Sequence, residues 1–219
     1  MGTIKDTVSK DIQAQKAVGI VEKSEYDQAL AQYNLNITDE EVKAAVTKII
    51  AEKVSENDNL EVKRFLLGSV ELTTLSTTDT EEKVLEMVEK VNRFDAEYPD
   101  LPHVAALCAY PCFTKLMADS LEIDGVDITN VTGNFPSSQT FLEVKTIETA
   151  LAIKDGATHI DIVMPVGKFL SGDYEGVCDT INELKQVCGD VPMKVILETG
   201  DLGNASAIKT ASLLSMYAG

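Results

Sequence analysis

Five short apolar runs alternate with amphipathic segments from residue 68 onward, and this alternation constrains the fold more than any other feature of the chain. The runs begin near residues 69, 103, 126, 159 and 193, so they recur every 23 to 34 residues. A strand followed by a helix takes about this length, and the alternation is typical of a parallel sheet. The runs are apolar on both alternating faces, as expected of strands covered on both sides. The sequence therefore predicts an α/β fold with about five parallel βα units.

The helices between these runs have recognisable starts. Thr78 and Glu81 have the spacing of a capping box, so we expect Thr78 to open the helix whose apolar face begins at Val84. Further helices are predicted by helical periodicity over residues 113–121, 139–154, 174–188 and 204–217.

Residues 1–60 differ from the rest, because they show helix and loop patterns without strands. A short helix is predicted over residues 24–32. Thr38 and Glu41 form another capping-box pattern before a helix that ends near Val54, and Asn59 is placed to cap a helix over residues 60–67. The pattern favours two regions: a helical N-terminal extension at 1–60, acting as a cover or partner surface, and a βα domain at 61–219.

Charge and composition exclude several classes of partner. Nineteen basic residues face thirty-six acidic ones, which gives a net charge of 19 − 36 = −17. This balance argues against binding to nucleic acid or to an anionic membrane, since both are polyanions. No segment approaches the roughly 20 apolar residues of a membrane span, and the N-terminus lacks the apolar core of a secretory signal. Four cysteines are too few for a disulfide scaffold, so we expect a cytoplasmic protein.

Motifs for common cofactors are missing from the sequence. It contains neither a P-loop nor a GxGxxG motif after a strand, and no GxSxG nucleophile elbow. Cys108 and Cys112 have no second ligand pair at zinc-ribbon spacing, so two small buried cysteines are the better interpretation. We therefore expect no cofactor and no metal.

The informative residues are charged side chains inside apolar runs. Asp161 lies between two isoleucines, and in the next run Lys194 and Glu198 share one face by strand alternation. A buried carboxylate needs a cation or strong donors, so Asp161 is expected near Lys194 or Glu198. The pair is either a proton-transfer site or a buried ion pair that fixes strand register, and spacing leaves both open. Glu71, inside the first run, leaves the same two alternatives.

Five ordered motifs resemble the deoxyribose-phosphate aldolase family: ELTTL (71–75), ALCAYPCF (106–113), VTGNFP (131–136), GATHIDIVMPVGKFLSGD (156–173) and KVILETGDL (194–202). The resemblance covers about residues 60–219 without large gaps. It implies a (βα)₈ barrel of the TIM type. It also implies reversible cleavage of 2-deoxyribose 5-phosphate to glyceraldehyde 3-phosphate and acetaldehyde through a lysine Schiff base, without a metal.

The resemblance assigns roles position by position. Asp161 matches the family's proton-relay aspartate in strand four, and Cys108 matches its active-site cysteine in strand two. Lys194 matches the lysine that opens strand five. Glu71 stands where the family usually has aspartate, so its carboxylate is one methylene longer.

The resemblance also implies what lies outside this sequence. In the family, the Schiff-base lysine stands in strand six, directly after the position of Gly219. Lys194, beside Asp161 and Glu198, would have a raised pKa and remain an unreactive ammonium. We therefore expect a partial barrel of five units, a truncated homologue that is inactive alone. Two alternatives are an active lyase that uses Lys194 or a complementing chain, and a non-catalytic oligomeric binding or structural module.

A five-stranded partial barrel also predicts association. Its first and last strands would be unpaired, and its inward face, to which Leu107, Val163 and Ile196 are assigned, would lack cover. We expect a homodimer or larger homo-oligomer, formed by pairing of partial barrels, by strand exchange, or by the N-terminal helices packing into the open face. A small sugar phosphate is the expected ligand, if there is one.

Overall fold

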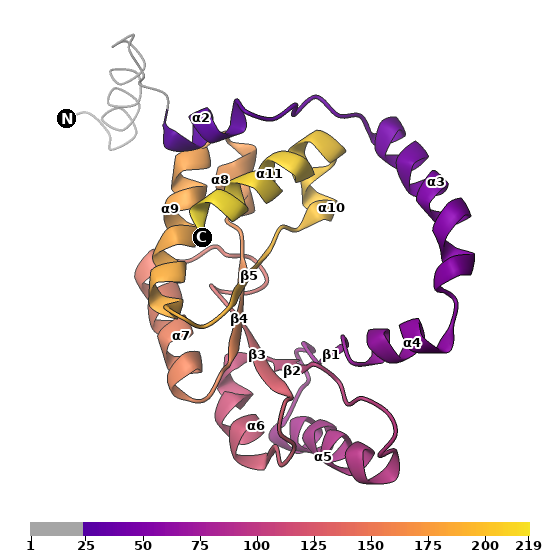
Figure 1. Cartoon of the computed structure of the whole chain (residues 1–219). Helices are drawn as coiled ribbons and strands as arrows, with labels where there is room; N and C mark the ends of the chain where they lie inside the picture. Colours follow the sequence, from indigo (N-terminus) through magenta and orange to yellow (C-terminus); the bar gives the residue numbers. More distant parts are fainter. Residues whose placement is uncertain (1–23) are drawn as a thin grey trace, which may run out of the picture.

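The structure is a computed structural model that describes residues 24–219, and one parallel sheet lies at its centre (Figure 1). The sheet has five strands in the order β1-β2-β3-β4-β5, each hydrogen-bonded to the next in sequence. This confirms the predicted α/β architecture of five parallel βα units. The strands are β1 (Glu71–Thr73), β2 (Ala106–Ala109), β3 (Asp127–Thr132), β4 (His159–Val163) and β5 (Met193–Ile196).

Helices follow the strands as the alternation predicts, and most begin close to the expected residues. They are α2 (Glu25–Leu30), α3 (Asp39–Asn57), α4 (Leu60–Leu67), α5 (Glu81–Glu97), α6 (Thr114–Ser120), α7 (Leu142–Lys154), α8 (Val166–Leu170), α9 (Tyr174–Cys188), α10 (Thr199–Leu202) and α11 (Ala205–Ala218), with a 3₁₀ turn at Pro111–Phe113.

The predicted caps are confirmed with one exception. Thr38 and Glu41 form the reciprocal capping box of α3, and Asn59 caps α4. The cap of α5 is Thr80, not Thr78: the Thr80 side chain accepts from the Lys83 amide, whereas the Thr78 hydroxyl contacts Ser76 Oγ at 2.9 Å in the preceding turn. The capping-box spacing was therefore coincidental there.

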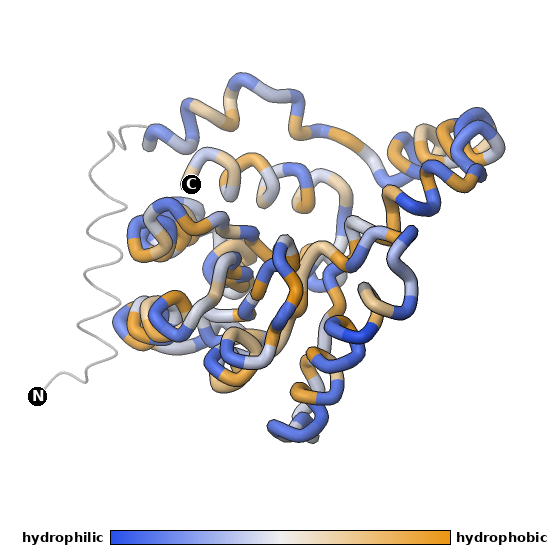
Figure 2. The backbone as a smooth tube through the Cα atoms, turned by 60° about the horizontal axis from the view of Figure 1, so that its bottom comes forward, coloured by the Kyte–Doolittle hydropathy of each residue, from blue (hydrophilic) through white to orange (hydrophobic). Residues whose placement is uncertain are grey.

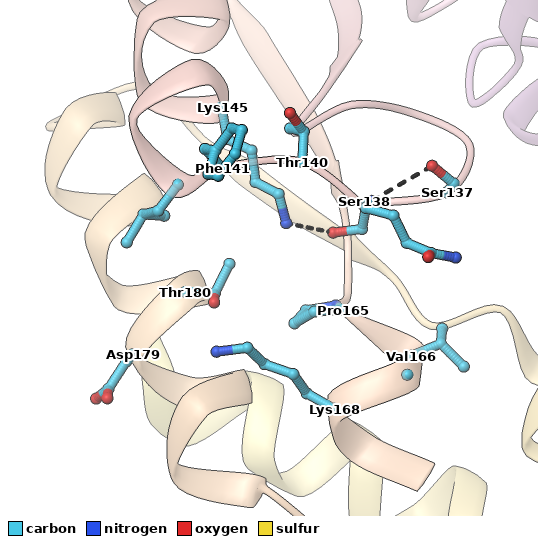
Figure 3. A pocket seen from close by; sticks show the side chains of 13 residues that line it. Ser137, Ser138, Thr140, Phe141, Lys145, Pro165, Val166, Lys168, Asp179 and Thr180 are labelled. Atoms are coloured by element: carbon cyan, nitrogen blue, oxygen red, sulfur yellow. Dashed lines mark hydrogen bonds between the residues drawn. The ribbon is translucent and has the colours of Figure 1, made fainter. Parts of the chain in front are cut away.

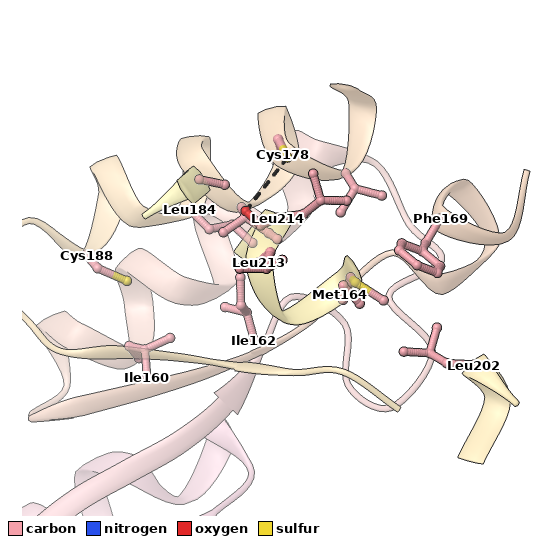
Figure 4. Close-up of a cluster of buried hydrophobic side chains, with 14 of the residues drawn as sticks. Ile160, Ile162, Met164, Phe169, Cys178, Leu184, Cys188, Leu202, Leu213 and Leu214 are labelled. Carbon is pink, nitrogen blue, oxygen red and sulfur yellow. Dashed lines mark hydrogen bonds between the residues drawn. The ribbon is translucent and has the colours of Figure 1, made fainter. Parts of the chain in front are cut away.

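Two buried clusters lie between the sheet and its helices. The larger one joins β4 to α9 and α11 and includes Ile160, Ile162 and Leu184 (Figure 4). The smaller one joins β2 and β3 to α5 and α6. Leu107 is fully buried in this smaller cluster with Val84 of α5, so its assignment to the inward face of the barrel was wrong. Because side chains alternate between the two faces along β2, Leu107 points to the face of the sheet that α5 and α6 cover.

Within the N-terminal region, α2 packs against the body, whereas α3 stands apart from it (Figure 1). Leu30 of α2 is buried in the cluster that contains α9 and α11. The start of α3 is tied to α11, because the Ala205 amide donates to Asp39 Oδ1 at 2.7 Å. No residue of α3 is buried, so this helix does not fill the open face of the sheet. Residues 1–23 of the predicted extension lie outside the described residues.

Hydrophobic residues are exposed along α3. The backbone tube in Figure 2, coloured by hydropathy, shows hydrophobic and hydrophilic residues interspersed along this helix. The exposed apolar residues are Val42, Val46, Ile49, Ile50 and Val54. Between residues 24 and 219, no helix has both the length and the apolar character needed to cross a membrane.

Candidate active site

Three charged side chains meet on the inward face of the sheet. The Lys194 ammonium donates to both carboxylate oxygens of Glu71, at 2.9 and 3.1 Å, and lies 3.2 Å from Asp161 Oδ2. The side chain of Asp161 is 11% exposed, that of Glu71 29% and that of Lys194 51%. The cluster is therefore a carboxylate–lysine–carboxylate arrangement whose deepest member is Asp161.

The sheet brings these residues together in two ways. Asp161 and Lys194 are register partners on the neighbouring strands β4 and β5, so their side chains emerge side by side. Glu71 comes from β1, at the opposite edge of the sheet, and reaches Lys194 because the sheet curves like part of a barrel. The expected neighbour Glu198 is not part of the cluster: β5 ends at Ile196, and Glu198 has a left-handed backbone with φ of 55°. Glu71 takes its place beside Lys194.

Burial dominates the electrostatics of Asp161. Desolvation raises the pKa of its carboxyl above the ordinary value, Lys194 opposes that rise, and the Glu71 charge adds to it. Its second oxygen, Oδ1, is buried without a hydrogen-bond partner among residues 24–219. A carboxyl in this environment is easier to protonate than an exposed one, which suits a group that takes up and returns a proton.

Lys194 and Glu71 stabilise each other's charged forms. Burial lowers the pKa of Lys194, but the hydrogen bond that its ammonium donates to Glu71 and the charge of Asp161 outweigh this effect, so the pKa is raised. Burial raises the pKa of Glu71, but the approach of the Thr129 hydroxyl and the Lys194 ammonium outweigh it, so that pKa is lowered. Lys194 is therefore held as an ammonium, which cannot attack a carbonyl.

Cys108 lies on β2 in register with Thr73 of β1 and is buried at 2% exposure. Desolvation, with the charges of Glu71 and Asp161, raises the pKa of its thiol to about 12. The thiolate is the reactive form of cysteine, so Cys108 lines the site as a neutral thiol and is not a nucleophile.

Within the described part of the chain, no three His, Cys, Asp or Glu residues gather into a group that could hold a metal ion.

Two polar residues, one on a strand and one on a helix, were missed by the sequence analysis. Thr129 of β3 faces Glu71 and influences its carboxyl. Lys145, in the first turn of α7, is buried at 3% exposure. Lys145 could have been found from the polar stripe that it forms with Thr149 one turn later, but apolar residues on the opposite side of α7 give a stronger helical pattern.

Comparison with known proteins identifies the family. The model of the DeoC/LacD family aldolases matches residues 65–219. Human deoxyribose-phosphate aldolase is 33% identical over 165 residues, which are 68% of this chain and 50% of the human protein. A putative deoxyribose-phosphate aldolase of Caenorhabditis elegans is 32% identical over 183 residues, 82% of this chain and 59% of that protein. The chain thus spans about half the length of the curated relatives that it matches.

Solved structures show the same scaffold. The tetrameric deoxyribose phosphate aldolase of Aeropyrum pernix is 28% identical with a TM-score of 0.59, over 74% of this chain and 64% of that one. A putative deoxyribose-phosphate aldolase of Coccidioides immitis is 23% identical with a TM-score of 0.64, over 85% of this chain and 71% of that one, and shows the likeness of fold. From this agreement of family model, relatives and fold, the chain belongs to the DeoC/LacD family of aldolases.

Proposed function

We propose that this chain supplies the proton-transfer half of a deoxyribose-phosphate aldolase site and forms no Schiff base by itself. The relatives that it matches are named for deoxyribose-phosphate aldolase. The observation that carries the proposal is the position of the Lys194 ammonium between Glu71 and Asp161. The reaction of the complete site is the reversible cleavage of 2-deoxyribose 5-phosphate to glyceraldehyde 3-phosphate and acetaldehyde.

Each member of the cluster has a role in this proposal. Asp161, with a raised pKa and a buried oxygen that accepts no hydrogen bond from the described residues, moves the proton during carbon–carbon bond cleavage. Glu71 holds the Lys194 ammonium in place, and that ammonium offers positive charge to a bound sugar oxygen. Cys108 closes the wall beside them as a neutral thiol. No metal or cofactor enters this scheme.

Imine formation needs a neutral amine, so we expect the purified chain to form no adduct at Lys194. The chain is incubated with acetaldehyde and borohydride, and its peptides are weighed to locate any modified lysine. Cleavage of 2-deoxyribose 5-phosphate is measured in parallel and should equal that of buffer. The exposed Lys154 of α7 serves as the background for non-specific alkylation.

A specific adduct at Lys194 together with turnover would contradict the proposal and favour the alternative of an active lyase that uses this residue. Turnover only after addition of a polypeptide with further βα units would favour the complementing-chain alternative. Among residues 24–219, β1 and β5 pair with a neighbouring strand on one side only, which supports that second possibility, because a sheet edge offers backbone groups for pairing.

We also infer that the chain associates with itself, and that the outward face of α7 is the contact surface. This face is apolar although it lies on the surface, and its exposed residues are Phe141, Val144, Ile147 and Leu151. Lys145 and Thr149 point inward instead. An exposed apolar stripe along a helix is typical of an interaction site. The relative from Aeropyrum pernix is a tetramer.

Replacing Ile147 by aspartate is therefore expected to shift the chain toward the monomer, because a charge at the centre of an apolar contact would be desolvated without a partner. Sedimentation velocity at several concentrations measures the shift. The matched control is Ile50→Asp on α3, which is exposed to a similar extent on another face. A monomeric wild type, or an equal shift in both variants, would rule out α7 as the contact surface.

Two further parts of the proposal concern the location and organisation of the chain. All four cysteines are free thiols, which supports a reducing compartment such as the cytoplasm. We assign residues 1–60 to a helical extension and residues 61–219 to the aldolase scaffold, a division supported by the family match from residue 65.

A further inference from the structure

A buried lysine without a counter-ion lies outside the carboxylate–lysine cluster. Lys145 is 3% exposed and donates to Ser138 Oγ at 2.6 Å. Among residues 24–219 it forms no ion pair within 4 Å. An ammonium carries three donors, so two of those of Lys145 have no acceptor in this part of the chain. A buried cation in this position is costly unless something supplies an opposite charge.

The acceptor of Lys145 is held by an unusual backbone conformation. Ser138 has a φ of 57°, a left-handed conformation that is strained for a residue with a side chain. Its hydroxyl donates to the Val163 carbonyl at 2.8 Å, so a lone pair of the hydroxyl remains to accept from Lys145. The Ser138 hydroxyl therefore holds the Lys145 ammonium in a position that faces the neighbouring cavity.

That space is a cavity of about 780 Å³ between α7, α8 and α9 (Figure 3). Lys145 enters it from α7, Lys168 enters from α8, and Thr180 of α9 stands on the wall near them. The Thr180 hydroxyl donates to the Gly176 carbonyl, so the donors that remain among these three side chains are the two ammonium groups.

Three carboxylates lie around these ammonium groups, but none of the three forms an ion pair with Lys145. Lys168 lies 3.8 Å from Asp173 Oδ2, and its ammonium also donates to the Gly176 carbonyl at 3.3 Å. Glu148, one turn along α7, uses one carboxylate oxygen to accept from the Asn134 amide. Asp179 is exposed at the rim of the cavity, and its carboxylate points away from the two ammonium groups in Figure 3. Burial, with the nearby Lys168 charge, lowers the pKa of Lys145 to about 8.

We propose that the cavity between α7, α8 and α9 is a binding site for a tetrahedral oxyanion such as the phosphate group of a small ester, with Lys145 and Lys168 as its cationic ligands. A dianion would supply the missing counter-charge and accept from the unused donors of Lys145. The site shares no residue with the Glu71–Asp161–Lys194 cluster. It is therefore independent of the proposed aldolase chemistry.

Sulfate is the probe for the test, because its charge does not change between pH 7 and pH 9. Calorimetric titration at pH 7 and low ionic strength is expected to show one site with a dissociation constant of about 1 mM or tighter. Lys145→Met and Lys168→Met should each weaken binding by about tenfold or more, since each removes one charge-assisted contact. Lys154→Met, on the same helix but exposed outside the cavity, is the matched control and should bind as the wild type does.

Binding should also depend on pH in a defined direction. With a pKa of about 8, the ammonium form of Lys145 falls from about nine-tenths at pH 7 to about one-tenth at pH 9. Sulfate affinity of the wild type is therefore expected to fall about tenfold over this range, whereas Lys145→Met should show little change. Glycerol phosphate and glycerate, titrated in the same way, distinguish a phosphate ligand from a carboxylate.

Absence of saturable sulfate binding at pH 7 would overturn the proposal. So would binding that Lys145→Met and Lys168→Met leave unchanged, or binding that is as tight at pH 9 as at pH 7. If Lys145→Met fails to fold, Lys168→Met decides the outcome alone. Lys168 is exposed and belongs to neither buried cluster, so its replacement should not affect folding. Tighter binding of glycerate than of glycerol phosphate would overturn the phosphate assignment.

Discussion

Replacing Leu184 by alanine is expected to lower the free energy of unfolding by about 3 kcal/mol. Leu184 is completely buried in α9, within the larger of the two clusters. Its Cδ1 atom and the Ile162 side chain close over Gly133, where the chain leaves β3. The alanine variant loses the transfer free energy of the removed carbons and leaves a cavity that the rigid sheet cannot fill.

Urea unfolding followed by circular dichroism measures this loss, which corresponds to a fall of about 6–12 °C in Tm for a chain of this size. Leu170→Ala in α8 is the matched control, since Leu170 is 60% exposed and its truncation should change the free energy of unfolding by less than about 0.5 kcal/mol. Similar losses in both variants would mean that α9 is not packed on the sheet as the structure has it.

The strand framework could be predicted from the sequence because its signals are local. The apolar runs before Ala109, Thr132 and Val163 contain the observed strands, and each is followed by a helix that covers it. Helix caps at Thr38 and Asn59 were also predictable, since a capping side chain bonds an amide only three residues away. Short helices such as α8 and α10 were missed, because four or five residues do not establish a helical period.

The candidate site was only partly predictable, because its geometry depends on tertiary structure. Strand alternation placed Asp161 beside Lys194 correctly, since the two are register partners on adjacent strands. The contact between Lys194 and Glu71 depends on the curvature of the whole sheet, which no local pattern encodes. Glu198 was misplaced because strand alternation was extended past Ile196, where the strand ends.

The orientation of α7 shows how a local pattern can mislead. By periodicity, Val144, Ile147 and Leu151 would face the core, yet all three are exposed. The helix turns a polar stripe inward instead, because Thr149 bonds Thr132 at 2.9 Å and Lys145 bonds Ser138. Tertiary hydrogen bonds therefore override amphipathicity there, which is why the cavity next to Lys145 could not be predicted.

Replacing Lys194 by methionine is expected to lower the free energy of unfolding by about 2 kcal/mol at pH 7. The change preserves side-chain volume but removes the ammonium that lies between the Glu71 and Asp161 carboxylates. The loss is smaller than for a fully buried ion pair, because Lys194 is half exposed and water screens part of the charge.

The loss of stability in Lys194→Met should depend on pH, and the direction of this dependence follows from the two carboxyl groups. Removing the ammonium raises the pKa of both carboxyls in the folded state. When the pKa of a carboxyl is higher in the folded than in the unfolded state, protonation of that carboxyl favours folding. The loss of unfolding free energy in Lys194→Met is therefore full at neutral pH and becomes smaller as the pH falls toward the folded-state pKa. Urea unfolding of wild type and variant at pH 5 and pH 7.5 measures this difference.

The double variant Lys194→Met/Asp161→Asn separates electrostatics from packing. Asparagine removes the buried negative charge that Lys194 no longer compensates, so the double variant should recover most of the stability lost by Lys194→Met at pH 7.5. A deficit that is equal at both pH values and is not relieved by Asp161→Asn would show that the aliphatic stem of Lys194, not its charge, stabilises the site. Recovery of stability by the double variant would show that the uncompensated Asp161 carboxylate causes the deficit of Lys194→Met.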